Sequence, residues 1–339
     1  MAGRDTVNLR PNVIEMRNVY KQWGEKVGVH DMSLDVPQGN IFGLVGPSGC
    51  GKTTTIRMLT GVYAPTKGDL RVLGATPQTF DKRARERIGY MPQLFVLYPT
   101  LTVWENLNFV ASLYGLGWFR RRKRLEELLE FVELTPARNT LAEKISGGMK
   151  RRLELACSLV HQPQLLFADE PTAGVDPVLR GKFWDGFRRL KTEGRTLLVT
   201  TQYVSEVEYC DQVAVMRAGR LLMVETPEGL RRRAFGGREV IELHVDAEDE
   251  RNARAILRQL PFVDDVRRPH NQPVGTLHIF VDNAGARIPE MIQQLGTDNS
   301  IDMRNAQEFK PPFDDVFIIL MEQAAADDPE SVVEEVVNA

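Results

Sequence analysis

A short glycine-rich segment limits what this chain can fold into more than any other part of its sequence. Gly46, Gly51, Lys52 and Thr53 have the spacing G-x-x-x-x-G-K-T, after an apolar run at 41–45 that predicts a buried parallel strand. Glycines let backbone amides approach phosphate oxygens, the lysine binds β- and γ-phosphates, and the threonine hydroxyl ligates Mg²⁺. We therefore predict ATP and Mg²⁺ binding by the whole loop: Gly46, Pro47, Ser48, Gly49, Cys50, Gly51, Lys52, Thr53 and Thr54.

Two adjacent carboxylates follow a second apolar run, at 164–168, which predicts another buried strand. Asp169 stands at the end of this strand, where it can hold Mg²⁺ through the water shell of the ion together with Thr53. Glu170 comes next and can polarise an attacking water as a general base. The pair predicts hydrolysis as well as binding; the alternative is a solvated Asp-Glu pair at a strand end.

Strands and helices alternate through the front of the chain, with a third apolar strand at 195–200 and a mostly helical stretch between about 100 and 160. There Thr102 and Glu105 have the spacing of a capping box. This order predicts an α/β fold with a largely parallel sheet. After a joint at 225–238, a strand-helix-strand-strand-helix-strand pattern predicts a small ferredoxin-like α+β domain. We expect domains at 1–230, with a helical subdomain at about 95–160, and at 238–323, followed by an acidic, disordered tail at 324–339.

Charge is divided unevenly along the chain. From Gly236 onward there are 9 Lys and Arg against 21 Asp and Glu, which leaves 34 against 25 in residues 1–235. The acidic rear half argues against nucleic acid as a partner. Cys50, Cys157 and Cys210 lack metal-ligand or C-x-x-C spacing, which fits a reducing compartment. No apolar run reaches the roughly 18 residues of a membrane span, and residues 1–10 lack the apolar core of a signal peptide, so we expect a cytosolic chain.

A third motif separates the many classes of nucleotide hydrolase. Ser146, Gly147, Gly148 and Met149 begin the segment S-G-G-M-K-R-R, which resembles the L-S-G-G-Q signature of ATP-binding-cassette (ABC) ATPases. A serine N-cap and two glycines at a helix start form an anion site. The resemblance implies a P-loop ABC cassette whose signature binds the γ-phosphate held by the opposite subunit. Two ATP molecules would then be enclosed in a head-to-tail dimer.

Other segments match this family in its usual order over residues 13 to about 230. Gln93, in Y-M-P-Q, resembles the Q-loop residue that contacts Mg²⁺ and the attacking water. Asp176, in A-G-V-D-P, resembles the aspartate that reaches across the dimer. Trp23 matches the aromatic residue that stacks on adenine, a contact worth about 1–3 kcal/mol, with Tyr20 as the alternative.

The chain departs from the family pattern at two positions. Met149 replaces the usual signature glutamine, and Gln202 replaces the histidine that contacts the γ-phosphate. Glutamine keeps a donor and an acceptor but cannot become positively charged. We therefore expect Gln202 to take part in hydrolysis that is slower or differently coupled.

The rear domain indicates the subfamily. Its segment P-F-D-D-V-F-I at 312–318 resembles the end of the accessory domain of ABC-2-type exporter ATPases of the daunorubicin-resistance type; an amphipathic closing helix is the alternative. The resemblance implies a homodimeric ATPase at the cytoplasmic face of the cell membrane. It would be bound through a separate permease that exports a drug, lipid or other hydrophobic substrate. Two alternatives are a soluble ABC-type ATPase acting on nucleic acid or ribosomes and a degenerate regulatory cassette.

A run of five basic residues at 120–124 follows Trp118 and Phe119. Such a run can contact anionic lipid, with about 1 kcal/mol from each cation near the surface. It can equally be the solvated first turn of a helix that continues through Leu125, Leu128 and Leu129. The sequence leaves both interpretations open.

Overall fold

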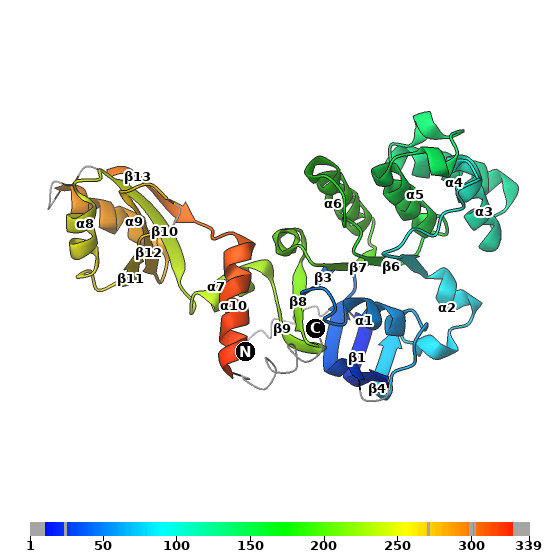
Figure 1. Cartoon of the computed structure of the whole chain (residues 1–339), viewed down its shortest axis with the longest axis horizontal. Coiled ribbons are helices and arrows are strands. Elements are labelled where there is room, and N and C mark those ends of the chain that lie inside the picture. The colour runs from blue at the N-terminus through cyan, green and yellow to red at the C-terminus, as the bar shows by residue number, and fades with distance from the viewer. Residues whose placement is uncertain (1–10, 24–25, 270–271, 298–300, 302, 328–339) are drawn as a thin grey trace, which may run out of the picture. The chain divides into compact units, whose positions relative to one another are not determined.

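The computed structural model describes residues 11–23, 26–269, 272–297, 301 and 303–327, and the chain divides at Pro227 into two compact units (Figure 1). Among the described residues, no helix is long and apolar enough to cross a membrane. The strands of the first unit are β1 (Asn12–Trp23), β2 (Lys26–Pro37), β3 (Ile41–Val45), β4 (Lys67–Val72), β5 (Ile88–Met91), β6 (Leu165–Asp169), β7 (Thr196–Thr201), β8 (Gln212–Arg217) and β9 (Arg220–Glu225). Its helices are α1 (Lys52–Leu59), α2 (Lys82–Glu86), α3 (Val103–Leu113), α4 (Trp118–Phe131), α5 (Gly147–Leu159) and α6 (Pro177–Thr192), with shorter turns η1 (Pro77–Thr79), η2 (Thr135–Ala137), η3 (Ala142–Lys144) and η4 (Val204–Tyr209).

A six-stranded sheet in the order β5-β6-β7-β3-β8-β9 forms the centre of the first unit. All its pairs are parallel except β8 with the edge strand β9, so the predicted α/β fold with a mostly parallel sheet is confirmed. Every residue of β3, β6 and β7 is buried, as the continuous apolar runs predict. Parallel strands place their carboxyl ends at one edge of the sheet, so the segments after β3, β6 and β7 meet there.

A second, antiparallel sheet of three strands has the order β2-β1-β4. Its inner side chains, among them Ile14, Met16 and Met32, share one apolar core with α1 and with β3. The helices α3, α4 and α5 form a separate group beyond the edge of the large sheet (Figure 1). The predicted capping box at the start of α3 is confirmed, because Glu105 N donates to Thr102 Oγ1 at 3.1 Å and Thr102 N donates to Glu105 Oε2 at 2.8 Å.

The second unit contains α7 (Pro227–Ala234), β10 (Glu239–Val245), α8 (Glu250–Leu257), β11 (Val263–Arg267), β12 (Thr276–Val281), α9 (Ala284–Ile292), a π-turn η5 (Gln293–Thr297), β13 (Met303–Phe309) and α10 (Phe313–Asp327). Its four strands form an antiparallel sheet in the order β11-β12-β10-β13, which confirms the predicted ferredoxin-like pattern. One feature differs from the prediction. Helix α10 continues to Asp327, although we expected disorder from residue 324; residues 328–339 lie outside the described part.

Candidate nucleotide site

The glycine-rich loop connects β3 to α1 and is packed too closely for side chains at two of its glycines. A Cβ on Gly46 would lie 2.3 Å from the carbonyl oxygen of Met216. Gly51, the N-cap of α1, has φ +104°, and a Cβ there would lie 2.5 Å from the carbonyl oxygen of Gly28. The loop therefore keeps a backbone surface at the start of α1, where backbone amides and the helix dipole favour an anion.

Lys52 is the first residue of α1, and only 4% of it is exposed. Its Nζ donates to the carbonyl oxygens of Gly46, at 2.8 Å, and of Pro47, at 2.9 Å. The same Nζ lies 3.5 Å from Oε1 of Glu170. The loop thus folds around the lysine, which brings a buried cation and a buried carboxylate to one place.

Asp169 is fully buried at the end of β6. Its Oδ1 accepts from Thr200 Oγ1 at 2.7 Å and from Thr53 Oγ1 at 3.2 Å, whereas its Oδ2 has no hydrogen-bond partner among the described residues. Burial raises the pKa of Asp169 above its usual value, although the bonds from Thr200 and Thr53 oppose this. A cation near Oδ2 would satisfy the free oxygen and favour the ionised form, so the residues present fit Mg²⁺.

Glu170 has φ +47°, a left-handed backbone conformation that is uncommon for a residue other than glycine. Its amide N donates to Thr200 Oγ1 at 2.9 Å, and its Oε2 accepts from Gln93 Nε2 at 2.9 Å. Its side chain is oriented from both sides, by Gln93 and by the Lys52 ammonium. Backbone strain of this kind persists where the surroundings fix it, and it is frequent at functional sites.

Gln202 follows the last residue of β7, at the same edge of the sheet. Its Oε1 accepts from Ser48 Oγ of the glycine-rich loop at 2.8 Å. The structure therefore brings together the predicted Ser48 and Gln202.

A cavity of about 530 Å³ opens beside these groups, and Trp23 and Gly28 line part of it. Its lining also includes eight of the predicted phosphate and catalytic residues: Ser48, Gly49, Gly51, Lys52, Thr53, Thr54, Gln93 and Glu170. The ring of Trp23 is 45% exposed and lies over Gly28. Tyr20, the alternative aromatic residue, packs edge-to-face on His30 with 4.8 Å between ring centroids. Of the two, only Trp23 borders this cavity within the described residues.

The predicted signature lies elsewhere. Ser146 caps α5, with its Oγ accepting from Met149 N at 3.2 Å, and Gly147 and Gly148 form the first turn. Asp176 caps α6, with its Oδ1 accepting from the amide of Leu179 at 3.0 Å. Within the described part of the chain, none of these predicted residues lines the cavity. The glycine-rich loop at the start of α1 and the signature at the start of α5 are thus two separate helix N-termini, the kind of position that favours an anion.

Comparisons with known proteins identify the family. The profile of the family described as ABC transporter matches residues 29–173. The linearmycin resistance ATP-binding protein LnrL of Bacillus subtilis (strain 168) is 35% identical over 312 residues, which cover 91% of this chain and 98% of that protein. This chain belongs to the ATP-binding proteins of ABC transporters. The predicted family and the predicted ATPase activity are therefore confirmed.

Other relatives match about two thirds of this ABC ATPase. Nod factor export ATP-binding protein I of Burkholderia orbicola (strain AU 1054) is 39% identical, over 68% of this chain and 76% of that protein. The probable multidrug ABC transporter ATP-binding protein YbhF of Escherichia coli (strain K12) is also 39% identical, over 65% of this chain but only 38% of YbhF.

Solved structures agree with the fold of the ABC ATPase. The structure described as the ATP binding subunit of an ABC transporter is 27% identical, with a TM-score of 0.61, over 66% of this chain and 94% of the other. A dimeric post-hydrolysis state of the cassette MJ0796, bound to ADP and Pi, is 26% identical, with a TM-score of 0.58, over 63% of this chain and 98% of the other.

Two buried charged residues of the ABC ATPase were missed by the sequence analysis. Arg151, on α5, is 3% exposed and donates to the carbonyl oxygens of Pro92, after β5, and Glu170, after β6. Glu206, in η4, is fully buried and accepts from Thr172 Oγ1 and Thr201 Oγ1, both at 2.6 Å. Arg151 stands in a basic run that predicts a solvated helix face, and the burial of Glu206 depends on segments distant in sequence, so neither residue has a local signal.

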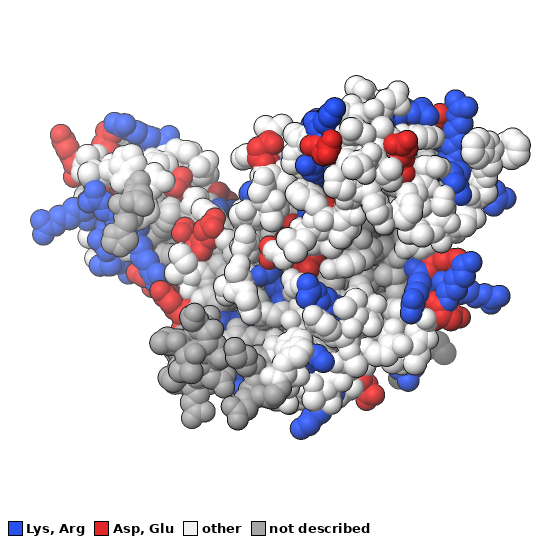
Figure 2. Space-filling model, turned by 45° about the vertical axis from the view of Figure 1, so that its right-hand side comes forward, with Lys and Arg blue, Asp and Glu red and all other residues white. Residues whose placement is uncertain are grey.

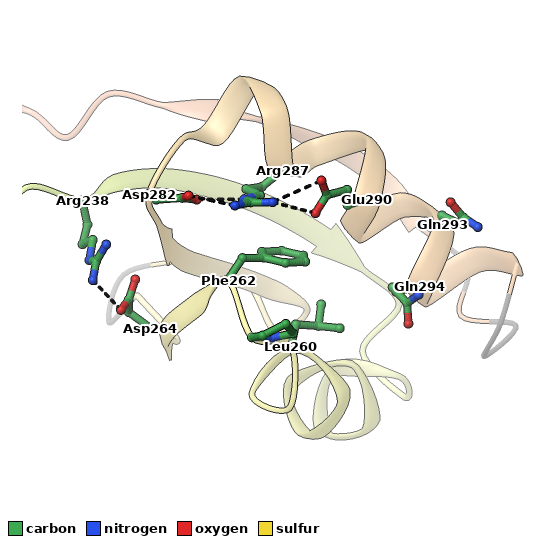
Figure 3. A pocket seen from close by; sticks show the side chains of 10 residues that line it. Arg238, Leu260, Phe262, Asp264, Asp282, Arg287, Glu290, Gln293 and Gln294 are labelled. Atoms are coloured by element: carbon green, nitrogen blue, oxygen red, sulfur yellow. Dashed lines mark hydrogen bonds and ion pairs between the residues drawn. The ribbon is translucent and has the colours of Figure 1, made fainter.

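A larger cavity, of about 630 Å³, lies in the second unit between α9 and the segment 260–264 (Figure 3). Its arginines are already engaged. Arg287 donates to Asp282 at 2.8 Å and to Glu290 at 2.9 Å, and Arg238 donates to Asp264 at 2.7 Å. Hydrogen bonds from Arg287 lower the pKa of Asp282 to about 2. Because both arginines already pair with carboxylates, this cavity lacks a cation placed like Lys52 at the start of a helix. We assign no nucleotide to it.

Proposed function

We propose that this ABC ATPase is the ATP-hydrolysing subunit of an ABC-2-type exporter. It works at the cytoplasmic face of the membrane with a separate permease, through which a drug, lipid or other hydrophobic compound leaves the cell. The names of relatives, which mention linearmycin resistance and Nod factor export, support export. We further propose residues 1–230 as the nucleotide-binding domain, with a helical subdomain at about 95–160, and 238–323 as its accessory domain.

The catalytic part of the proposal is carried by one observation, the arrangement of Lys52, Gln93 and Glu170 around one cavity. Lys52 would bind the β- and γ-phosphates, and Glu170 would accept a proton from the attacking water. Gln93 donates to the carboxylate of Glu170 and would hold it toward that water. Trp23 would stack on adenine.

Asp169, Thr53 and Gln93 are the residues that would hold Mg²⁺, and Thr53 Oγ1 already donates to Asp169 Oδ1 at 3.2 Å. The ion, when bound with ATP, would neutralise charge that develops on the phosphates. The described residues contain no cluster of three or more His, Cys, Asp or Glu that could hold a metal ion. The ion would therefore take most of its ligands from phosphates and water, as Mg²⁺ commonly does.

A cassette dimer completes the proposal. The signature residues do not line the cavity of their own chain, and they stand at the start of a helix, where an anion is favoured. We propose that Ser146, Gly147 and Gly148 of one copy contact the ATP of the other, with Met149 beside it and Asp176 at the interface. ATP would close the dimer and hydrolysis would reopen it.

The decisive experiment compares the parent chain with Glu170→Gln. A general base commonly contributes about 10²–10⁴-fold to rate, so turnover should fall by at least about 100-fold. Light scattering should show Glu170→Gln as a dimer in Mg-ATP and as a monomer without nucleotide. Glu86→Gln, on the exposed side of α2, is the matched control and should keep parental turnover.

The outcomes separate the proposal from its alternatives. Binding of ATP with no turnover in the parent would indicate a regulatory cassette. Stimulation of turnover by RNA or DNA would indicate a nucleic-acid ATPase. A Glu170→Gln chain that stays monomeric in Mg-ATP would refute the dimer, and failure to co-purify with a co-expressed permease would refute the transport assignment.

A further inference from the structure

The turn between α3 and α4 carries an unusual surface, which we call the α3–α4 tip. It consists of three apolar and three basic side chains: Leu113, Trp118, Phe119, Arg120, Arg122 and Lys123. Leu113 is 68% exposed, Trp118 76% and Phe119 91%. Adjacent large apolar side chains with such exposure mark a surface that meets another apolar phase.

The chain fixes this tip in place. Arg121 points back to the end of α3, where it donates to Ser112 Oγ at 2.9 Å, and to the turn, where it donates to the carbonyl oxygen of Leu116 at 2.7 Å. The ring of Tyr114 stacks on His161, which lies in the turn after α5, with 3.7 Å between the centroids. The turn between α3 and α4 is thus bound to the end of α3 and to the turn after α5. Trp118 and Phe119 are held outward on the first turn of a helix, instead of folding onto the protein.

Two of the three basic residues lie one helical turn behind the aromatic pair, and Arg120 directly follows Phe119. Arg122 and Lys123 are four positions after Trp118 and Phe119, so each follows its aromatic residue on the same face, about 6 Å along the axis. Arg120 and Lys123 make no hydrogen bond or ion pair within the described residues, and the first turn of α4 contains no acidic residue. Figure 2 shows Lys and Arg side chains gathered along the edge formed by α3 and α4, at the upper right.

We propose that the α3–α4 tip binds directly to the surface of an anionic lipid membrane. Trp118 and Phe119 enter the boundary between headgroups and acyl chains, where aromatic residues are enriched. Arg120 beside them, and Arg122 and Lys123 one turn behind, reach lipid phosphates. Their spacing matches the depth of this boundary, roughly 5–10 Å. This contact is additional to the permease contact of the proposed function and does not depend on it.

A lipid surface suits the tip better than a protein partner does. The aromatic pair stands exposed on the first turn of α4, and the three basic side chains are long and exposed, with Arg122 also bonded to the exposed Glu126 Oε1 at 3.1 Å. A fluid surface of mobile phosphates can pair with such cations without a preformed acidic groove. A protein partner is the competing possibility, and the experiment below distinguishes it.

The test measures flotation of the purified full chain with two kinds of vesicle. One kind contains phosphatidylglycerol and phosphatidylcholine in equal parts, and the other contains phosphatidylcholine alone. The parent should bind the anionic vesicles more tightly. Trp118→Ser with Phe119→Ser should weaken this binding about tenfold or more, because each ring loses apolar burial. Changing Arg120, Arg122 and Lys123 to Gln should weaken it about 100-fold, since each cation contributes about fivefold.

The matched control changes Lys82, Arg83 and Arg85 of α2 to Gln, which removes the same charge from exposed positions of the same unit. It should bind vesicles nearly as the parent does. An equal loss in this control would show that only net charge matters, and would overturn the proposal. Parental binding by the Trp118 and Phe119 variant would assign the tip to a protein partner and also overturn it. All variants should keep the basal ATPase turnover of the parent. A variant that misfolds would lose this turnover, and a parent without turnover would contradict the ATPase assignment but not the lipid contact.

Discussion

Replacing Arg151 by methionine should lower the unfolding free energy of the first unit by about 3–5 kcal/mol, the cost of breaking a buried ion pair by removing one partner. Methionine keeps most of the length of the side chain but removes the guanidinium. That group donates at 2.6–3.2 Å to the carbonyl oxygens of Pro92, Gln93, Asp169, Glu170 and Pro171, and at 2.9 Å to Glu154 Oε2. One side chain thus joins the segment after β5, the segment after β6 and helix α5.

The size of the effect follows from what the substitution leaves behind. Glu154 is 3% exposed, and within the described residues its carboxylate retains one other bond, from Val96 N at 2.9 Å. Burial already raises the pKa of Glu154, against the bond from Val96 and the pairing with Arg151. Without the arginine this pKa rises further, and the carboxyl escapes part of the cost by taking a proton. The deficit should therefore grow as the pH rises through that pKa, because ionisation then favours the unfolded chain.

Tryptophan fluorescence in urea measures this effect without interference from the second unit. The chain has 4 tryptophans, at 23, 104, 118 and 184, and the first unit extends to Pro227. In a thermal scan, the same loss should lower the transition by roughly 10 °C, at about 2–4 °C per kcal/mol for a unit of this size.

Arg152→Met is the matched control. Arg152 donates to the carbonyl oxygen of Val132 at 2.9 Å, but its side chain is 20% exposed, so its loss should cost about 1 kcal/mol. Combining Arg151→Met with Glu154→Leu removes both buried charges and should recover part of the stability lost in the single variant, while the carbonyl groups still lack the arginine. Equal midpoints for Arg151→Met and Arg152→Met, or a double variant no more stable than Arg151→Met, would refute this reasoning.

Two further predictions concern the two units separately. Trp23→Ala should weaken ATP binding by about 1–3 kcal/mol, measured by titration with a fluorescent nucleotide, while Tyr20→Ala should leave it unchanged; the reverse result would move the adenine contact to Tyr20. Acid should weaken the second unit as the pH falls from about 4 toward about 2, because Asp282, whose pKa Arg287 lowers to about 2, becomes protonated there. Asp282→Asn should show less of this loss by hydrogen exchange with mass spectrometry, and an unchanged acid profile would contradict the role of the pair.

Local patterns predicted the parts of the fold that depend on local chemistry. The runs that became β3, β6 and β7 are continuous and apolar because both faces of a parallel sheet are covered. Gly46 and Gly51 are glycines because a Cβ there would strike the backbone of Met216 or Gly28. The motif alone was nevertheless enough to predict the phosphate-binding loop. The end of α10 was predicted too early, because acidic composition was weighted above three alanines at 324–326, which favour helix.

The sequence could not reveal contacts that depend on distant segments. Arg151 belongs to a run of three basic residues, a pattern that indicates a solvated face. Its burial requires carbonyl groups some 20 and some 60 positions away to converge on α5. Likewise, Glu206 is buried because Thr172 and Thr201 both donate to it. Such residues carry no periodicity, and only the assembled sheet edge explains them.

The glycines of the chain differ in what requires them, and this difference bears on the proposed dimer. Gly46 and Gly51 are required within the chain, since a Cβ at either would strike backbone. At Gly147, a Cβ would meet nothing within 4 Å among the described residues, and the backbone there has no positive φ. A glycine in a helix is about 1 kcal/mol less favourable than alanine. Gly147 therefore lowers the stability of the first turn of α5, and no contact within the described part of the chain requires a glycine there. A surface that must approach phosphate closely supplies a reason, and within this chain the cavity lies elsewhere. Gly147→Ala should therefore leave the unfolding of one chain unharmed while weakening assembly in Mg-ATP.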